Sequence, residues 1–190
     1  MGYRDNEWPN SLNNLIWCIG DSFTLGLGQP VHETWPKMLE SRTGLRCLNL
    51  GEDGCSNDSI QLKAQFISKN YLPSVLVIMW SYLHRRYIDG RNVHFDRENF
   101  GNEYDIKNFV SNYKAVENIG CNVVHSVIPN CCIDKDIRPT VDRLLPNNDI
   151  IWIKQLDRSR DGHHFDIKTS DGLSRLIEKR IYSLIPKIPK

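Results

Sequence analysis

Short apolar segments recur along the chain, and each one is followed by a turn-forming or polar residue. They are rich in β-branched and aromatic residues, and they show little alternation between apolar and polar positions. Such runs are typical of strands that are buried on both faces of a sheet. The segments that predict strands are residues 15–19, 45–50, 75–80, 121–128 and 150–153.

Longer amphipathic segments lie between these runs. They predict helices at residues 33–42, 57–69, 105–119 and 170–184. The last of them follows the N-cap candidates Thr169 and Ser170 and repeats apolar residues at helical spacing from Leu173 onward. Alternation of strands and helices indicates βαβ units, so we expect an α/β fold with a mostly parallel sheet covered on both faces. The polar segment 85–101 predicts a long loop over the carboxyl edge of that sheet.

Length and composition favour one globular domain over residues 1–190. Hydrophobic residues make up 40% and charged residues 25%, which is ordinary for such a domain. The formal net charge is +1, and Lys and Arg are scattered, so we expect neither a nucleic-acid partner nor binding to membranes. No secretory signal is visible, and the six cysteines form no C-x-x-C pair. We therefore expect reduced thiols and a cytoplasmic protein.

Ligands of open α/β sheets bind beyond the carboxyl ends of the strands, which makes the residues after each apolar run informative. Ser22 stands just after the first run, in Gly20-Asp21-Ser22. Its hydroxyl becomes a nucleophile only beside a base, and a serine here is also compatible with a simple helix cap. Near the last predicted helix, Asp161 and His164 form a D-x-x-H pair, which offers a base and the carboxylate that orients it.

A post-strand G-D-S in the first unit, together with D-x-x-H before the final helix, resembles the SGNH (GDSL-type) hydrolase family. Its members are esterases, lipases, thioesterases and carbohydrate deacetylases. The resemblance implies a flavodoxin-like, three-layer α/β/α sandwich without a cofactor. It also implies that Ser22 is the nucleophile, His164 the general base and acid, and Asp161 the orienting carboxylate. Residues 49–54 resemble the family's second block, whose glycine, here Gly54, donates a backbone N–H to the oxyanion.

The third block departs from the family pattern. Family members carry G-x-N-D after the third strand, and the asparagine side chain completes the oxyanion hole. Here the third apolar run continues into residues 81–86, which contain no asparagine. Ser81, Tyr82 and Arg85 are the candidates for a replacement donor. The cation of Arg85 is also suited to an anionic group on the substrate.

The resemblance implies hydrolysis of an ester through an acyl-enzyme on Ser22, with a small-molecule or carbohydrate ester, such as an O-acetyl sugar, as substrate. Two alternatives stay open. One is an O-acyltransferase that uses the same triad. The other is a binding module with weak or no catalysis, in which the aromatic residues Trp80, Tyr82, Tyr87 and Phe95 stack on a sugar.

A metal site is another hypothesis for the segment 161–166, which holds four side chains able to bind a metal. Adjacent histidines such as His163 and His164 tend to point apart, and no second cluster has ligand spacing. We therefore expect no metal.

Overall fold

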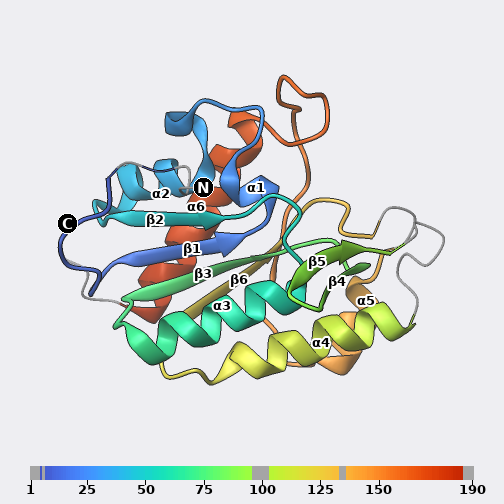
Figure 1. Ribbon diagram of the computed structural model, residues 1–190. Coiled ribbons are helices and arrows are strands. Elements are labelled where there is room, and N and C mark those ends of the chain that lie inside the picture. The colour runs from blue at the N-terminus through green and yellow to red at the C-terminus, as the bar shows by residue number, and fades with distance from the viewer. Residues whose placement is uncertain (1–4, 6, 96–102, 133–135, 186–190) are drawn as a thin grey trace.

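The computed structural model describes residues 5, 7–95, 103–132 and 136–185 (Figure 1). Its centre is a five-stranded sheet in the order β2-β1-β3-β6-β7, in which every neighbouring pair runs parallel. The strands are β1 (Ile16–Gly20), β2 (Cys47–Gly51), β3 (Val75–Trp80), β6 (Val123–Val127) and β7 (Ile151–Trp152). All five apolar runs of the sequence therefore form strands of one sheet, as predicted.

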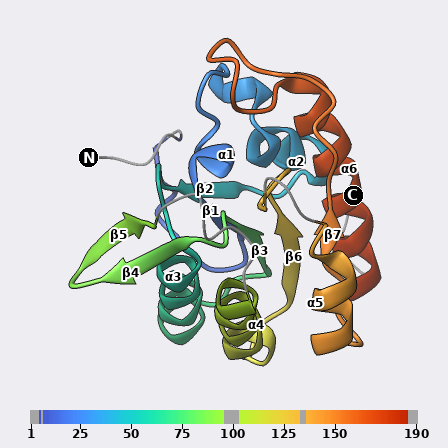
Figure 2. The ribbon, with the colours of Figure 1, turned by 90° about the vertical axis from the view of Figure 1, so that its right-hand side faces the viewer.

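Helices cover both faces of this sheet and make three layers (Figures 1 and 2). On one face, α2 (Trp35–Thr43) packs against α6 (Ile167–Leu184), and Arg42 of α2 reaches Asp171 and Ser174 of α6. The other face carries α3 (Asn57–Asn70), α4 (Glu103–Glu117) and α5 (Arg138–Leu144). The four predicted helices are present, and α5 and the one-turn helix α1 (Ser22–Leu25) are additions. The α/β/α sandwich expected from the sequence is confirmed.

The strands lack polar alternation because both of their faces are packed. Every residue of β3 is buried, from Val75 to Trp80. Burial of this continuous apolar strand between two helical layers contributes to the hydrophobic stabilisation of the centre of the fold. No helix among the described residues combines the length and the apolar character that crossing a bilayer requires.

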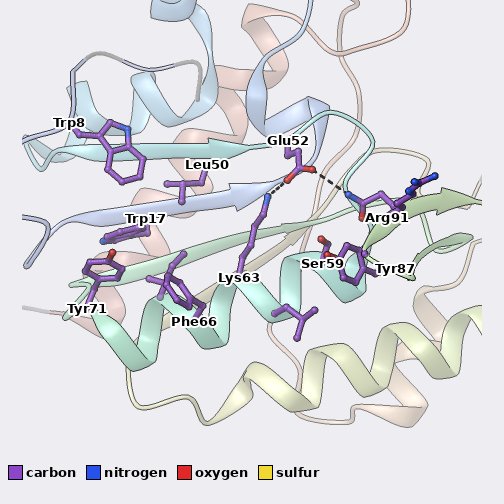
Figure 3. A pocket seen from close by; sticks show the side chains of 14 residues that line it. Trp8, Trp17, Leu50, Glu52, Ser59, Lys63, Phe66, Tyr71, Tyr87 and Arg91 are labelled. Atoms are coloured by element: carbon purple, nitrogen blue, oxygen red, sulfur yellow. Dashed lines mark hydrogen bonds and ion pairs between the residues drawn. The ribbon is translucent and has the colours of Figure 1, made fainter. Parts of the chain in front are cut away.

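A cavity of about 820 Å³ lies between α3 and the β1–β2 side of the sheet (Figure 3). Aromatic side chains, among them Trp8, Trp17 and Tyr71, gather at one end of it. The other end is polar, and there Lys63 Nζ of α3 lies 2.5 Å from Glu52 Oε2, just beyond β2. The cavity therefore runs from an aromatic end to a charged end at the carboxyl edge of the sheet.

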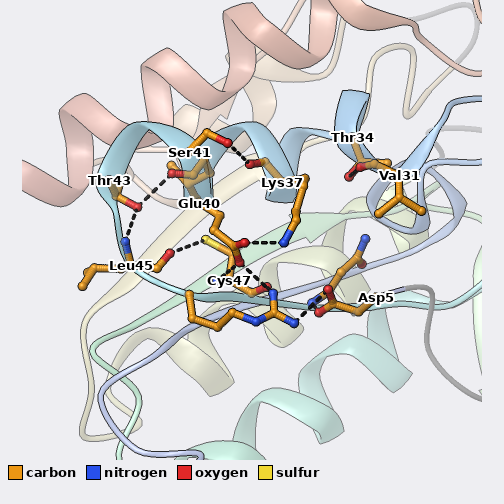
Figure 4. Close-up of polar contacts among 12 residues, drawn as sticks. Asp5, Val31, Thr34, Lys37, Glu40, Ser41, Thr43, Leu45 and Cys47 are labelled. Atoms are coloured by element: carbon orange, nitrogen blue, oxygen red, sulfur yellow. Dashed lines mark hydrogen bonds and ion pairs between the residues drawn. The ribbon is translucent and has the colours of Figure 1, made fainter. Parts of the chain in front are cut away.

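The outer edge of β2 is capped by side chains instead of by another strand (Figure 4). Glu40 Oε2 accepts the Cys47 N–H at 2.9 Å, and Asp5 Oδ2 accepts the Asn49 N–H at 3.0 Å. Arg46 joins the two carboxylates, with nitrogen–oxygen distances of 2.7 Å to Glu40 and 3.0 Å to Asp5. Satisfying its N–H groups in this way makes the edge a poor template for pairing with another strand.

The prediction of one long loop over residues 85–101 is wrong for residues 85–94. These residues form an antiparallel hairpin of β4 (Arg85–Ile88) and β5 (Arg91–His94) beside α3 at the carboxyl edge. Its turn is Asp89-Gly90, and both residues have positive φ, 49° and 77°, as the favoured two-residue hairpin turn requires. Residues 96–101 of the predicted loop lie outside the described residues.

Candidate active site

The residues around Ser22 form a sharp turn from strand to helix. β1 ends at Gly20, and Ser22 is the first residue of the one-turn helix α1 (Ser22–Leu25). Asp21 caps this helix, because its Oδ1 accepts the Phe23 N–H at 3.0 Å. A Cβ on Gly20 would overlap the Thr24 hydroxyl and lie 2.9 Å from the Met79 carbonyl oxygen, so only glycine fits there. The turn therefore fixes Ser22 at the carboxyl edge of β1.

His164 lies beside Ser22. Its Nε2 is 2.8 Å from Ser22 Oγ, and its Nδ1 is 2.6 Å from Asp161 Oδ2. Both Ser22 and His164 are buried, and the Phe23 ring packs 4.6 Å from the imidazole between ring centres. The structure thus brings together the three residues that the sequence predicted as a triad, in one hydrogen-bonded line.

The second oxygen of Asp161 is also occupied. Asp161 Oδ1 accepts the hydroxyl of Ser159 at 2.8 Å, the N–H of His163 at 2.8 Å and the N–H of His164 at 3.0 Å. Burial raises the pKa of Asp161, but these hydrogen bonds outweigh burial and hold the pKa well below its ordinary value. Asp161 is therefore an anion at neutral pH, and it faces Nδ1 of His164.

Two further residues hold the Asp161–His164 loop, and sequence reasoning did not single them out. Asp157 accepts the Asp166 N–H at 3.1 Å and binds the first turn of α6 through both the N–H and the hydroxyl of Thr169. Gly28, with φ of 77°, follows α1 and lies against Ser159 of the loop. A Cβ on Gly28 would overlap the Ser159 hydroxyl and lie 3.0 Å from Asp161 Oδ2.

Gly54 lies in the turn between β2 and α3, and the hairpin holds this turn in place. Its φ is 71°, a conformation that favours glycine. Asn92 Oδ1 of β5 accepts the Ser56 N–H at 3.0 Å and the Ser56 hydroxyl at 2.8 Å. His94 hydrogen-bonds with the Gly54 backbone, while burial and the nearby Arg85 lower the pKa of His94. The unpredicted hairpin is therefore the support of the second block.

In the third block, residues 81–86, two side chains bind Asp21. Ser81 Oγ donates to Asp21 Oδ2 at 2.6 Å, and Arg85 Nη1 donates to the same oxygen at 2.9 Å. The single hydroxyl proton of Ser81 is thereby committed to Asp21. Burial raises the pKa of Asp21, and Arg85 and Ser81 oppose that rise. Tyr82 lies with its hydroxyl 3.3 Å from His163 Nε2.

In the alternative of a binding module, four aromatic residues stack on a sugar, and the structure contradicts this for two of them. Trp80 is 0% exposed in β3 and Tyr82 is 8% exposed, so neither ring offers a face to a sugar. Tyr87 and Phe95 are exposed, at 40% and 45%.

The D-G-H-H segment does not gather a metal-ligand set in the part of the chain that the structure describes, where no three His, Cys, Asp or Glu side chains are arranged to hold an ion. His164 uses both ring nitrogens in hydrogen bonds to Ser22 and Asp161.

A second cavity, of about 660 Å³, opens beyond the ends of β6 and β7. Asn130, Arg138 and Trp152 are among its lining residues, and neither this cavity nor that of Figure 3 is lined by a member of the triad. Its rim approaches the site, because the amide of its lining residue Gln155 donates to the His163 carbonyl at 3.2 Å.

The fold is similar to that of several solved structures. No family model and no curated protein matches the chain. Among solved structures, a lipolytic protein of the G-D-S-L family from Desulfitobacterium hafniense DCB-2 is similar, with a TM-score of 0.57 and 14% identity over 89% of this chain and 99% of that one.

Two carbohydrate esterases are similar as well. One is a family 2 enzyme with a carbohydrate binding domain from Corynascus thermopiles (Myceliophthora fergusii), with a TM-score of 0.62 and 12% identity over 95% of this chain and 69% of that one. The other is an acetyl xylan esterase from the rumen bacterium Butyrivibrio proteoclasticus, with a TM-score of 0.60 and 9% identity over 95% and 66%. The chain thus has the SGNH/GDSL hydrolase fold and spans about two thirds of the length of these two esterases.

Proposed function

We propose that this protein is a serine hydrolase that cleaves esters through an acyl-enzyme on Ser22. The observation that carries the proposal is the hydrogen-bonded line from Ser22 Oγ through His164 to Asp161. A hydroxyl, an imidazole and an ionised carboxylate in this order meet the requirements for activating a serine. The fold shared with esterases and lipolytic proteins supports the same reaction class.

In the proposed reaction, Ser22 Oγ attacks the carbonyl carbon of the ester while His164 Nε2 takes the hydroxyl proton. Asp161 stabilises the imidazolium that forms. The tetrahedral intermediate then expels the alcohol, which receives the proton from His164. Water, deprotonated by His164, attacks the acyl-enzyme, and the carboxylic acid leaves as Ser22 regains its proton.

The oxyanion needs donors that are in place before the reaction. We assign this role to the backbone N–H groups of Ser22 and Gly54. As the first residue of α1, Ser22 has an N–H without a partner inside the helix. Tyr82 stays a candidate for a third donor or for substrate binding, whereas Ser81 and Arg85 both donate to Asp21.

For the substrate we propose a short acyl ester on a carbohydrate or another small molecule. The support is the activity named for the similar structures, which include an acetyl xylan esterase. An O-acyltransferase differs only in the acceptor, because an alcohol in place of water attacks the same acyl-enzyme.

The test is a hydrolysis screen with 4-nitrophenyl acetate, butyrate and octanoate, with an acetyl thioester and with acetylated xylan. The wild type should turn over at least one of them, and Ser22→Ala should abolish turnover while its circular dichroism stays unchanged. Activity retained in Ser22→Ala would end the assignment. Adding glycerol or xylose as an acceptor and analysing the products separates transfer from hydrolysis.

A binding module is the second candidate, and the absence of the family's third-block asparagine favours it. A fluorophosphonate probe distinguishes the two. The probe labels Ser22 in the wild type if the serine is activated, and it fails to label a binding module. Labelling should be lost in Ser22→Ala and in His164→Ala.

A further inference from the structure

One buried guanidinium contacts the three segments that build the proposed site. The first segment follows β1 and contains Asp21, the second follows β2 and contains Cys55, and the third follows β3 and contains Ser81. Arg85 Nη1 donates to Asp21 Oδ2 at 2.9 Å, to Ser81 Oγ at 2.8 Å and to the Cys55 carbonyl at 3.4 Å. The side chain of Arg85 is 9% exposed, and its guanidinium stacks 4.9 Å from the centre of the Tyr82 ring. This nitrogen thus lies where the first, second and third segments meet.

Two of these segments carry a group that the proposed reaction needs, and the third is fixed against them. Asp21 precedes the nucleophile Ser22, and Cys55 follows the oxyanion glycine Gly54. Ser81 begins the third segment, and Asn57 of α3 fixes its backbone by accepting the Ser81 N–H at 2.7 Å. The spacing between the Ser22 N–H and the Gly54 N–H therefore depends on contacts that converge on Arg85.

The link to Ser22 runs through Asp21. Asp21 is fully buried, and it caps α1 while it receives Arg85 and Ser81 on its other oxygen. A buried carboxylate that loses its cation is strongly destabilised and takes up a proton or moves. Either change disturbs the cap and, with it, the direction of the Ser22 N–H.

We propose that Arg85 is a positioning residue that sets the two backbone donors of the oxyanion hole, and that this network occupies the place of the family's third-block asparagine. The inference rests on the proposed ester hydrolysis. Arg85 acts through Asp21 and Cys55 and does not touch the substrate. Its loss should therefore act on the transition state and leave ground-state binding unchanged.

The chain supplies a matched control in Arg86. Arg86 is the next residue of β4 and is equally buried, at 5% exposure against 7% for Arg85. It faces away from the site, because it pairs with Asp105 of α4 and donates to the Leu83 carbonyl at 2.5 Å. Replacing either arginine removes a buried ion pair from the same hairpin, but only Arg85 contacts Asp21.

The experiment compares Arg85→Met with Arg86→Met on the ester found in the screen. We expect kcat of Arg85→Met to fall about 10²-fold with KM within about twofold of the wild type, which is the range for a displaced oxyanion donor. Arg86→Met should keep the wild-type kcat while unfolding at a lower temperature. Arg85→Lys, which retains the cation, should recover part of the lost kcat.

A double-mutant cycle tests the route through Asp21. If Arg85 acts through Asp21, the loss in kcat for Asp21→Asn combined with Arg85→Met should be much smaller than the product of the single losses. Three results would each overturn the inference: a double-variant loss in kcat equal to the product of the single losses, equal kcat values for the two arginine variants, or a change confined to KM. If Arg85→Met does not fold, Arg85→Lys against Arg86→Lys gives the same comparison. Fluorophosphonate labelling of wild-type Ser22 reports separately on the proposed function.

Discussion

His164 Nε2 lies 2.8 Å from Ser22 Oγ, although 142 residues separate the two along the chain. Ser22 is fixed by the turn after β1, and His164 by a loop that Asp161 and Asp157 tie down before α6. The short contact between Ser22 and His164 therefore depends on two segments that are held in place independently. Changes that loosen either anchor should reduce turnover without unfolding the sheet.

Replacing Asp161 with asparagine should lower kcat about 10³–10⁴-fold with little change in KM. Asparagine keeps the shape of the side chain but loses the charge that orients and stabilises the His164 imidazolium. Steady-state kinetics on the screened ester measure the effect. Asp157→Asn is the control, because Asp157 caps α6 and does not contact His164. It should lower the free energy of unfolding and reduce kcat far less than Asp161→Asn does, and a comparable kcat loss would contradict the assigned roles.

Gly54→Ala should reduce both stability and kcat. A residue with a side chain is strained at φ of 71° by about 1–2 kcal/mol, and the backbone escapes this strain by turning the proposed oxyanion N–H away. Gly44→Ala isolates the strain, because Gly44 has φ of 70° at the end of α2 with open space around it. Urea unfolding should show similar losses for both variants. Only Gly54→Ala should show a lower kcat; equal kcat values would remove Gly54 from the site.

Gly28→Ala should lower kcat although Gly28 belongs to no block of the family pattern. The added Cβ would overlap the Ser159 hydroxyl and press on Asp161, which must move away from His164. Gly120→Ala has the same kind of strain, at φ of 82°, with no atom nearby. Thermal unfolding and kinetics of the two variants separate strain from displacement. A wild-type kcat in Gly28→Ala would show that the loop absorbs the methyl group.

His125 should make the protein less stable in acid. Its Nδ1 accepts the Trp80 indole N–H at 3.2 Å, the Tyr113 ring packs 4.3 Å away, and burial lowers the pKa of His125 to about 3. The unfolded chain binds a proton near pH 6.5, so stability is complete above that pH and falls as the pH drops toward 3. Between about pH 7 and about pH 4 this one group costs about 3 kcal/mol.

His125→Asn tests that expectation, because asparagine keeps an acceptor for Trp80 and does not titrate. Its free energy of unfolding in urea should fall less steeply with pH than that of the wild type. Parallel curves for the two proteins would mean that His125 is protonated in the folded state as well.

The sequence predicted the sheet, and the edge at which Ser22 and His164 lie, for a physical reason. Runs such as 75–80 are apolar on both faces only when both faces are covered, and parallel strands place the residues after them at one edge. This placement makes Ser22 and His164 candidates, and the resemblance to SGNH hydrolases implies their roles. The same logic cannot tell where a side chain points. Arg85 looked like a donor to the substrate, yet it binds Asp21, 64 residues earlier in the chain.

The hairpin escaped prediction because its strands are short and polar. Residues 85–94 contain few apolar positions, so hydrophobic periodicity is silent there, and only the Asp89-Gly90 turn signalled a pair of strands. Gly28 and Asp157 escaped for another reason. Their importance comes from what they contact in the fold, Ser159 and Asp161 for Gly28 and the first turn of α6 for Asp157, to which a residue type alone gives no clue.

The position of His164 has a consequence for biosynthesis. Every described strand of the sheet precedes His164 in the chain, so the ribosome releases the complete sheet before the imidazole emerges. A domain folds as a unit, so the proposed nucleophile Ser22 gains its proton acceptor only when α6 docks against α2 and the loop before it takes its place. The proposed reactivity therefore arrives with completion of the fold and not before it.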